Sequence, residues 1–381
     1  MIPYSRQSIS QEDIDEVVRV LQSSHLTQGK EVELFEEAIC QYIGAKYAVT
    51  FNSATSALLG AYAVSDIKED DEIITTPISF VATSNMFVAL GAKPLWCDVK
   101  LDGNIDERFI ERLITPKTKA IVPVDFAGKP VEIKKINEIA KKHNLLVIQD
   151  SSHAFGSSID GQKIGTFADM TIFSFHAIKP LTTGEGGCVV TDNEEFAKRL
   201  RLFRSHGMIK KQLYNSDMVM LGHNFRLTEF AAALGHSQLK RLDNFLHVRD
   251  KIAKYYDERF KGHKLFSTIK LEANTTSSRH LYPIILSPAL QCPKEDIFKE
   301  LQERGLGVQV HYKPIYQNSY YKEKFGEISL HPKGTTHVSD DFYRSEISIP
   351  CHQEMSMEDT TFVADTFLEV IEKYAYRGCS F

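Results

Sequence analysis

The first part of the chain carries two helical hydrophobic patterns. Apolar residues spaced three and four positions apart predict a helix over Gln11–Leu21, and Ser10 is placed to cap its N-terminus. A polar turn follows this helix. A second pattern of the same period predicts a helix over residues 32–43, which Gly44 ends.

Short apolar runs then alternate with helical stretches. Several of these runs are nearly continuous in Val and Ile, which is typical of strands that helices cover on both faces. We predict strands over residues 47–51, 72–76, 94–98, 120–125, 145–150, 170–175 and 187–191. The rhythm predicts an α/β fold, and in such sheets ligands collect at the strand ends.

The hydrophobic pattern changes after Gly222, where a long helical run replaces the alternation. We predict helices over residues 227–239, 242–260, 294–304 and 357–374, and strands over residues 280–286 and 307–310. A chain of 381 residues is too long for one small core. We therefore predict a large domain over residues 1–240 and a smaller C-terminal α+β domain over residues 241–381.

Composition narrows the class of partner. The formal net charge is -5, and no dense block of Lys and Arg appears, which argues against nucleic acid or an anionic membrane as the partner. The cysteines form no CxxC pair and the histidines no HExxH motif, so we expect neither a disulfide framework nor a metal site. The N-terminus lacks an export signal, and no apolar run is long enough to span a bilayer. We expect a cytoplasmic protein that acts on a small molecule.

Lys179 is the candidate catalytic residue, because it lies between an apolar run and the Gly-rich turn at residues 182–187. A lysine at the end of a buried strand loses hydration, which favours the uncharged amine that attacks an aldehyde or carries a proton. A solvated turn lysine is the structural alternative, because Lys is seldom buried without a partner. The glycines of residues 184–187 either let the backbone approach a cofactor or turn the chain tightly, and we prefer the turn for Gly186 and Gly187.

Asp150 ends another predicted strand, and Ser151, Ser152 and His153 follow it directly. Taken alone, Asp150 is equally well explained as a helix N-cap. Together with Lys179 it suggests pyridoxal 5'-phosphate (PLP), a cofactor that needs a lysine for a Schiff base and a carboxylate at its pyridine nitrogen. The carboxylate keeps this nitrogen protonated, so that the ring can accept electrons.

A phosphate group would fit at residues 52–58, where a predicted strand ends and a helix begins. Unpaired amides and the helix dipole favour an anion there, and Thr55 and Ser56 add hydroxyl donors. A plain capping turn is the alternative. Ser174 offers a further donor, and Phe80 is placed to stack on the cofactor ring, although Phe is more often simply a core residue.

These motifs, in this order, resemble the DegT/DnrJ/EryC1/StrS family of sugar aminotransferases. The resemblance covers nearly the whole chain and rests on these segments: LTQGKEVELFEEA, FNSATSALL, TTPISFVATSN, NIDERFIERLITPKTKAIVPVDFAG, VIQDSSHAFG, IGTFADMTIFSFHAIKPLTTGEGG, RSHGM, GHNFRLTEFAAALG and VHYKPIY. It implies fold type I of the PLP-dependent transferases, as in aspartate aminotransferase, with a mostly parallel seven-stranded sheet. Within the family, SFHAIKP and HYKPIY are most similar to the 4-aminotransferases of pseudaminic acid synthesis.

The resemblance also implies a role for each candidate residue. Lys179 would hold the cofactor covalently and shuttle a proton, and Asp150 would bind the pyridinium. The cofactor phosphate and ring would be held by side chains at the strand ends: Thr55, Ser56, Phe80 and Ser174. The sequence departs from the family pattern at His153, which stands near the ring hydroxyl where many members have Gln, and at Ala54, where Gly is usual.

Family enzymes are dimers that complete each site with residues of the partner, so the resemblance implies a homodimer with shared active sites. Residues 222–226 match that contribution, and we expect Asn224 on the phosphate or the nearby substrate, with Arg226 as the second choice. By the same resemblance, two further segments would contact the nucleotide sugar: Tyr4, His25, Leu26 and Thr27, and His311, Tyr312, Lys313 and Pro314. Taken one by one, such residues are more often surface residues than ligands.

The resemblance implies transfer of an amino group from glutamate to the C4 keto carbon of a UDP-linked 4-keto-6-deoxy N-acetylhexosamine. The choice of UDP over TDP, and of C4 over C3, rests on the resemblance alone. Two other functions stay open: a sugar dehydratase on the same scaffold, in which a histidine stands at the lysine position, and a non-catalytic regulator. Lys179 argues against the dehydratase, and its presence together with Asp150 argues against the regulator.

Overall fold

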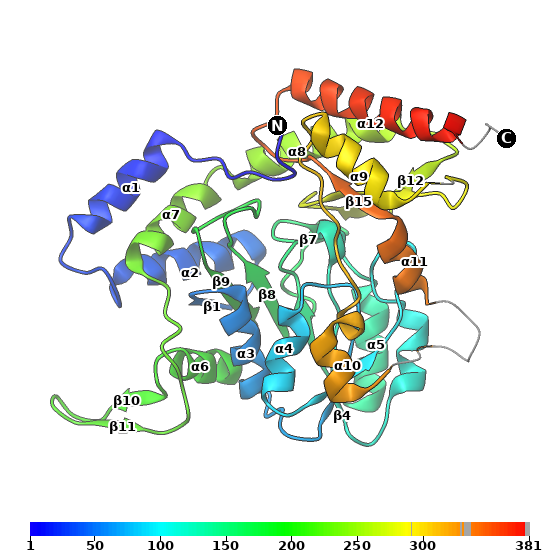
Figure 1. Ribbon diagram of the computed structural model, residues 1–381. Coiled ribbons are helices and arrows are strands. Elements are labelled where there is room, and N and C mark those ends of the chain that lie inside the picture. Colours follow the sequence, from blue (N-terminus) through cyan, green and yellow to red (C-terminus); the bar gives the residue numbers. More distant parts are fainter. Residues whose placement is uncertain (291, 328–329, 331–336, 378–381) are drawn as a thin grey trace.

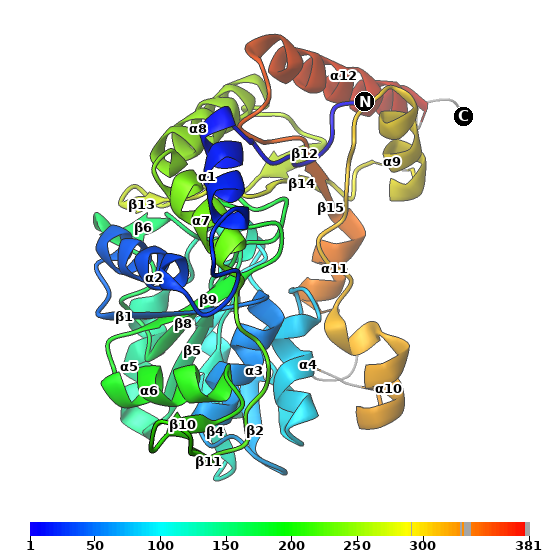
Figure 2. The ribbon, with the colours of Figure 1, turned by 90° about the vertical axis from the view of Figure 1, so that its left-hand side faces the viewer.

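The computed structural model describes residues 1–290, 292–327, 330 and 337–377. Its centre is a seven-stranded sheet with helices on both faces, as Figures 1 and 2 show. A smaller three-stranded sheet with its own helices lies beside it, at the top of both views, where the N-terminus also lies. The predicted α/β class with a smaller α+β part is confirmed.

The large sheet is mostly parallel, as predicted. Its strands, in order across the sheet, are β1 (Tyr47–Phe51), β9 (Gly187–Thr191), β8 (Met170–Ser174), β5 (Leu146–Asp150), β4 (Thr118–Val122), β2 (Glu72–Thr75) and β3 (Lys93–Trp96). Strand β9 is antiparallel to both of its neighbours, and the other pairs are parallel. The carboxyl ends of β5 and β8 therefore meet at one edge, which brings Asp150 close to the segment that carries Lys179.

Helices bury both faces of this sheet with apolar side chains. One face packs against α3 (Ala54–Val64), α4 (Ala82–Ala89) and α6 (Glu194–Phe203). The other packs against α2 (Lys30–Ile43), α5 (Ile133–His143) and α7 (Glu229–Leu239). Because strands covered on both sides have no face in water, their near-continuous Val and Ile content is explained.

The N-terminal helix α1 (Gln11–Leu21) has the predicted bounds, because neighbouring residues of the sequence form its N-cap. The Ser10 hydroxyl accepts the backbone N–H of Asp13, and the Asp13 carboxylate accepts the N–H of Ser10, which is a complete capping box. Helix α2 ends as predicted at Gly44, whose φ of 86° is left-handed.

The smaller sheet consists of β12 (Phe266–Thr268), β14 (Tyr282–Leu286) and β15 (Glu346–Ile349), all antiparallel. Its core also contains α8 (Leu242–Arg259), α9 (Lys294–Glu303) and α12 (Met357–Arg377), which confirms the helices expected there. The strand predicted over residues 307–310 is wrong. That segment forms only one bridge, Gln309 with Ser348, and Leu306 just before it forms another with Ile2, because the chain here runs between two parts of the molecule rather than inside a sheet.

The domain boundary at residue 240 stays a prediction. The chain returns to the large sheet after the smaller one begins, since Tyr316 and Tyr321, near and in α10 (Ser319–Phe325), belong to the core under α3 and α4. The remaining elements are α11 (Val338–Ser345), a small sheet of β6 (Ser158–Ile159), β7 (Gln162–Lys163) and β13 (Thr275–Thr276), and the hairpin of β10 (Met208–Lys210) and β11 (Ser216–Met218). The hairpin extends away from the other elements in Figure 1.

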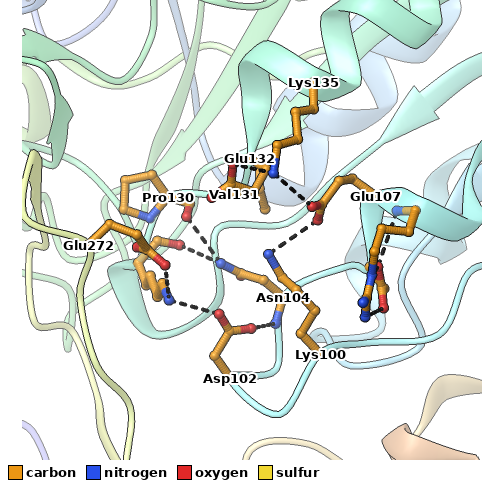
Figure 3. Close-up of polar contacts among 12 residues, drawn as sticks. Lys100, Asp102, Asn104, Glu107, Pro130, Val131, Glu132, Lys135 and Glu272 are labelled. Atoms are coloured by element: carbon orange, nitrogen blue, oxygen red, sulfur yellow. Dashed lines mark hydrogen bonds and ion pairs between the residues drawn. The ribbon is translucent and has the colours of Figure 1, made fainter.

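An ion cluster around the buried Lys129 side chain joins the loop after β3 to the chain that enters β13 (Figure 3). Lys129 Nζ donates to Asp102 Oδ2 (2.8 Å), to Glu272 Oε1 (2.9 Å) and to the carbonyl of Lys270 (2.9 Å). Asn104 Nδ2 donates to the carbonyls of Lys129 and Pro130. Because the Lys129 side chain is only 7% exposed, these contacts replace its hydration and tie the two segments together.

No helix in the part of the chain that the structure describes is long and apolar enough to cross a membrane. Nor do the described His, Cys, Asp and Glu side chains gather in a group of three or more that could hold a metal ion.

Candidate active site

A cavity of about 610 Å³ lies at the carboxyl ends of β5 and β8, between the large sheet and the segment before α10. It brings together many of the residues that the sequence singled out: Tyr4, Thr55, Phe80, Asp150, His153, Ser174, Lys179, His311 and Tyr312. These side chains come from six separate parts of the chain, which only the fold places side by side.

Lys179 is buried in this cavity. It closes a short turn after β8, in which its backbone N–H donates to the carbonyl of His176 (2.9 Å). Burial lowers the pKa of Lys179 to about 7, and the nearby Asp150 carboxylate opposes this shift. The Nζ atom lies 3.3 Å from Nε2 of His280, which is itself buried. An amine that is about half uncharged at pH 7 can act as a nucleophile and as a proton carrier.

Asp150 is held rigidly at the end of β5 by three donated hydrogen bonds. Its Oδ2 accepts from the Thr83 hydroxyl (2.7 Å), and its Oδ1 accepts from the Ser152 hydroxyl (2.6 Å) and the Ser152 N–H (3.1 Å). Thr83 is oriented in turn by Ser79 (2.7 Å between the hydroxyl oxygens). The helix-cap interpretation of Asp150 does not hold, because these bonds come from a loop and from the start of α4 and not from the first turn of a following helix.

The N-terminus of α3 lies at one end of the cavity. Ser53 caps this helix, and Ser53, Ala54 and Thr55 line the cavity, so the first helical amides and the Thr55 hydroxyl are available to an anion. Gly187 makes this possible by close approach. A Cβ at that position would lie 2.5 Å from the Ala54 nitrogen. The glycine belongs to β9 and has an ordinary φ, so its interpretation as a turn residue is wrong.

His153 is buried beside Lys179 and is held by two contacts. Its Nδ1 accepts the backbone N–H of Ala127 (3.3 Å), which leaves the ring proton on Nε2, 3.2 Å from the Tyr312 hydroxyl. Burial lowers the pKa of His153 well below its ordinary value, and the Lys179 charge acts in the same direction. The ring is therefore a neutral hydrogen-bond donor at its Nε2 edge.

The opposite wall carries aromatic and hydroxyl groups. Phe80 is 58% exposed and lies with its ring 6.3 Å from that of Tyr312, which leaves one face free for a planar ligand. Tyr4 contacts the His311 ring, at 5.5 Å between centroids. Ser174 lines the floor, and its Oγ accepts the N–H of His176 (3.4 Å).

Other predicted site residues lie outside this cavity. Ser56 is buried in the capping box of α3, and its hydroxyl donates to Asn52 Oδ1 (2.6 Å) instead of pointing to an anion. The rest are not among the cavity-lining residues: His25, Leu26, Thr27, Asn224, Lys313 and Pro314. Asn224 is exposed and bridges to Ser205, so in this chain it does not contact the cavity that holds Lys179. Their roles toward substrate or a partner subunit stay predictions.

Three neighbours of Lys179 and Asp150 were missed by sequence reasoning: Ser152, Thr83 and His280. Ser152 directly follows Asp150, and its hydroxyl next to a strand-end carboxylate was a usable signal. Thr83 and His280 lie 67 and 101 residues from their partners in the chain, and no local pattern marks either of them.

The geometry fits PLP. The cofactor requires an amine for its aldehyde, a carboxylate for its pyridine nitrogen and donors for its phosphate, and the cavity offers Lys179, Asp150 and the N-terminus of α3 in these roles. Gly187 has no side chain, so β9 can pass close to Ala54 without displacing the backbone at the start of α3.

Known proteins resemble this chain over nearly its whole length. The UDP-4-amino-4,6-dideoxy-N-acetyl-beta-L-altrosamine transaminase of Campylobacter jejuni is 50% identical over 100% of both chains. The protein of the same name from Helicobacter pylori is 46% identical over 97% of this chain and 98% of its own. The solved structure of Helicobacter pylori PseC, an aminotransferase involved in the biosynthesis of pseudoaminic acid, superimposes with a TM-score of 0.92 at 45% identity, over 98% of this chain and 99% of that one. Residues 7–368 match the model of one family, and the chain therefore belongs to the DegT/DnrJ/EryC1/StrS aminotransferase family.

Proposed function

We propose that this protein is a PLP-dependent aminotransferase that moves an amino group from glutamate to the C4 keto carbon of a UDP-linked 4-keto-6-deoxy N-acetylhexosamine, in pseudaminic acid biosynthesis. The observation that carries the proposal is that buried Lys179 and the fixed carboxylate of Asp150 line one cavity. The chain is also 50% identical to the UDP-4-amino-4,6-dideoxy-N-acetyl-beta-L-altrosamine transaminase of Campylobacter jejuni. Lys179 is retained, which favours amino transfer over the dehydratase. The described cysteines are all free, which supports our expectation of a cytoplasmic location.

When bound, PLP supplies an aldehyde that takes up the amino group and a ring that accepts electrons from the carbon being deprotonated. Lys179 Nζ is the group of this chain that would bond to the aldehyde. Once released, it would carry the proton between the substrate carbon that is deprotonated and the aldehyde carbon of the cofactor. Asp150, fixed by Thr83 and Ser152, would hold the proton at the pyridine nitrogen. His153 would donate from Nε2 to an oxygen on the ring or the substrate.

The test examines the reaction with the amino donor, glutamate, separately from the reaction with the ketosugar that accepts the amino group. The purified enzyme with PLP is first given glutamate alone, and the visible absorption of the cofactor bound to Lys179 is followed. We expect the band to be lost on glutamate addition, and no such change in Lys179→Ala. Failure to form any band would favour the non-catalytic regulator. The UDP-ketosugar is then added and the product analysed by mass spectrometry and NMR. Amination of a TDP-ketosugar only, or at C3, would refute the proposed acceptor.

We further propose a homodimer with shared active sites, in which Asn224 acts on the partner subunit's cofactor or substrate. Large apolar side chains on and beside the hairpin support an apolar contact with another chain: Leu213 is 90% exposed, Tyr214 91% and Leu221 73%. Mixing two inactive variants, Lys179→Ala and Asn224→Ala, tests the sharing. If Asn224 acts in trans, each mixed dimer contains one intact site and activity returns. If it acts within its own chain, the mixture stays inactive.

A further inference from the structure

A buried carboxyl group lies behind the cavity and has no part in the mechanism above. Glu346 opens β15 and is fully buried. Its Oε2 accepts the backbone N–H of His311 (2.7 Å), and its Oε1 lies 2.6 Å from the hydroxyl oxygen of Ser348. That hydroxyl oxygen lies 2.9 Å from Nδ1 of His311. A hydrogen-bonded chain therefore runs from the Glu346 carboxyl through Ser348 to the His311 ring.

The fold imposes this arrangement. Successive side chains of a strand alternate between its faces, so Glu346 and Ser348 point to the same side of β15. The free edge of β15 pairs with Gln309, since the N–H of Gln309 donates to the carbonyl of Ser348 (3.1 Å) and the N–H of Ser348 donates to the carbonyl of Gln309 (2.8 Å). This bridge fixes the segment in which His311 follows two residues later.

The other edge of the His311 ring is directed at the cavity. His311 lines the cavity together with Lys179 and Tyr4. Its Nε2 has no hydrogen-bond partner within the part of the chain that the structure describes, and it is not among the fully enclosed polar atoms. A ligand or solvent in the cavity therefore meets this nitrogen.

The Ser348 hydroxyl couples the protonation of Glu346 to that of His311, because a hydroxyl has only one proton to donate. When Glu346 is ionised, Ser348 donates to Oε1, its oxygen accepts from Nδ1–H, and Nε2 of His311 is a bare acceptor. When Glu346 is protonated, Oε1–H donates to Ser348, Ser348 donates to Nδ1, and Nε2 carries the proton. The ring is neutral in both cases, since burial and the Lys179 charge lower the pKa of His311 to about 3.

We propose that Glu346 and Ser348 are positioning residues that set the tautomer of His311 and, through it, substrate binding. The cavity edge of His311 donates a hydrogen bond when Glu346 is protonated and accepts one when Glu346 is ionised. The donor form recognises a keto or phosphoryl oxygen, which can only accept. The role toward substrate rests on the proposed function, whereas the tautomer itself does not.

The change falls near neutral pH. Burial raises the pKa of Glu346 to about 8, against the opposing effects of Ser348, the His311 N–H and the charge of Lys294. Lys294 faces Glu346 from α9, where its Nζ donates to the carbonyl of Glu346 (3.3 Å). Tyr312 faces it from the segment before α10 and stays neutral, because burial raises the pKa of Tyr312 well above its ordinary value. Below this midpoint His311 offers a donor, and above it an acceptor.

The charged and titratable groups around His311 do not produce the same change. The groups in electrostatic or ring contact with it are Tyr4, His153, Lys179, His280 and Tyr312. The rings of His153 and His280 stay neutral, because burial lowers the pKa of both well below the ordinary value. Lys179 titrates near pH 7, and its effect on His311 is through space, without a proton path to Nδ1.

The test reads the tautomer directly. Full-length enzyme loaded with PLP and labelled with 15N-histidine is titrated by NMR from about pH 6 to about pH 9.5, a range that brackets the expected midpoint. The His311 signals are assigned from their absence in His311→Asn. We expect the ring proton to move from Nε2 to Nδ1 with a midpoint near pH 8 while the ring stays neutral. A wild-type ring that keeps one tautomer throughout would overturn the proposal.

Two variants sharpen the result. In Glu346→Gln the amide oxygen still accepts the backbone N–H of His311, and the amide nitrogen donates to Ser348. Ser348 must then donate to Nδ1, so we expect the Nε2–H tautomer at every pH. In Ser348→Ala the link is cut, and the tautomer should no longer follow pH around 8. Circular dichroism checks that both variants are folded. A Glu346→Gln enzyme that still shows the wild-type transition would refute the link.

Substrate binding gives a readout of a second kind. The KM for the UDP-ketosugar should rise by roughly tenfold as pH passes the midpoint, the loss expected for one hydrogen bond of about 1.4 kcal/mol, and Glu346→Gln should abolish this rise. A wild-type KM that stays constant while the tautomer changes would refute contact between His311 and the substrate. If the tautomer titrates and no ketosugar is aminated, the proposed function fails and the proton link stands.

Discussion

Lys179 should react as a neutral amine at physiological pH. Its pKa of about 7 compares with 10.5 for an unburied lysine. At pH 7 about half of the Lys179 side chains would be uncharged, against roughly 1 in 3,000 at the ordinary pKa, and the difference corresponds to about 5 kcal/mol between the two protonation states. Burial supplies this effect, and the Asp150 carboxylate works against it.

The assay is reductive methylation of the cofactor-free enzyme with formaldehyde and cyanoborohydride, followed by mass spectrometry of the peptide that carries Lys179. Only the neutral amine reacts, so the pH at half-maximal rate reports the pKa. We expect a midpoint near pH 7, with the exposed lysines of the same protein as internal references. In Asp150→Asn the opposing charge is gone, so the midpoint should fall below that of the wild type.

A midpoint above about pH 9 would refute the reasoning, because it would mean that water or Asp150 compensates for burial. The same shift affects stability. A lysine whose pKa is lowered on folding contributes stability that is present above its unfolded pKa of 10.5 and is lost progressively as pH falls from there to about 7. Lys179→Met should therefore flatten the pH dependence of the free energy of unfolding between about pH 7 and 10.

Three further substitutions test buried contacts that hold parts of the fold in place. Arg249→Met should lower the free energy of unfolding by about 3 kcal/mol in chemical denaturation, because its guanidinium donates to the carbonyls of Arg279 (3.1 Å) and Cys351 (2.8 Å), which would lose their partner. Exposed Lys251→Met on the same helix is the control and should change little. Lys129→Met should cost about 2 kcal/mol by the same measurement, and a neutral result would show that water replaces its three bonds. Gly187→Ala should weaken PLP binding by roughly tenfold in a cofactor titration, because its Cβ would meet the Ala54 nitrogen at 2.5 Å, and an unchanged affinity would refute the close-approach argument.

The sequence by itself determined the features that depend on neighbours in the chain. Ser10 and Asp13 form a capping box within four residues, so the start of α1 was predictable. The apolar runs predicted the large sheet because a strand buried on both faces must be apolar throughout. Asp150 and Lys179 were identifiable because Asp150 ends such a run and Lys179 lies in the short turn after another, and parallel strands end at a common edge.

Only the tertiary structure decided which distant side chains surround that pair. Thr83 reaches Asp150, and Glu346 reaches His311, across different elements. The hydroxyl of Ser56 was expected on an anion, yet it is used inside its own helix cap. The physical reason is that a polar side chain takes the nearest partner that packing leaves within hydrogen-bond distance, and packing between elements is not written in any local pattern.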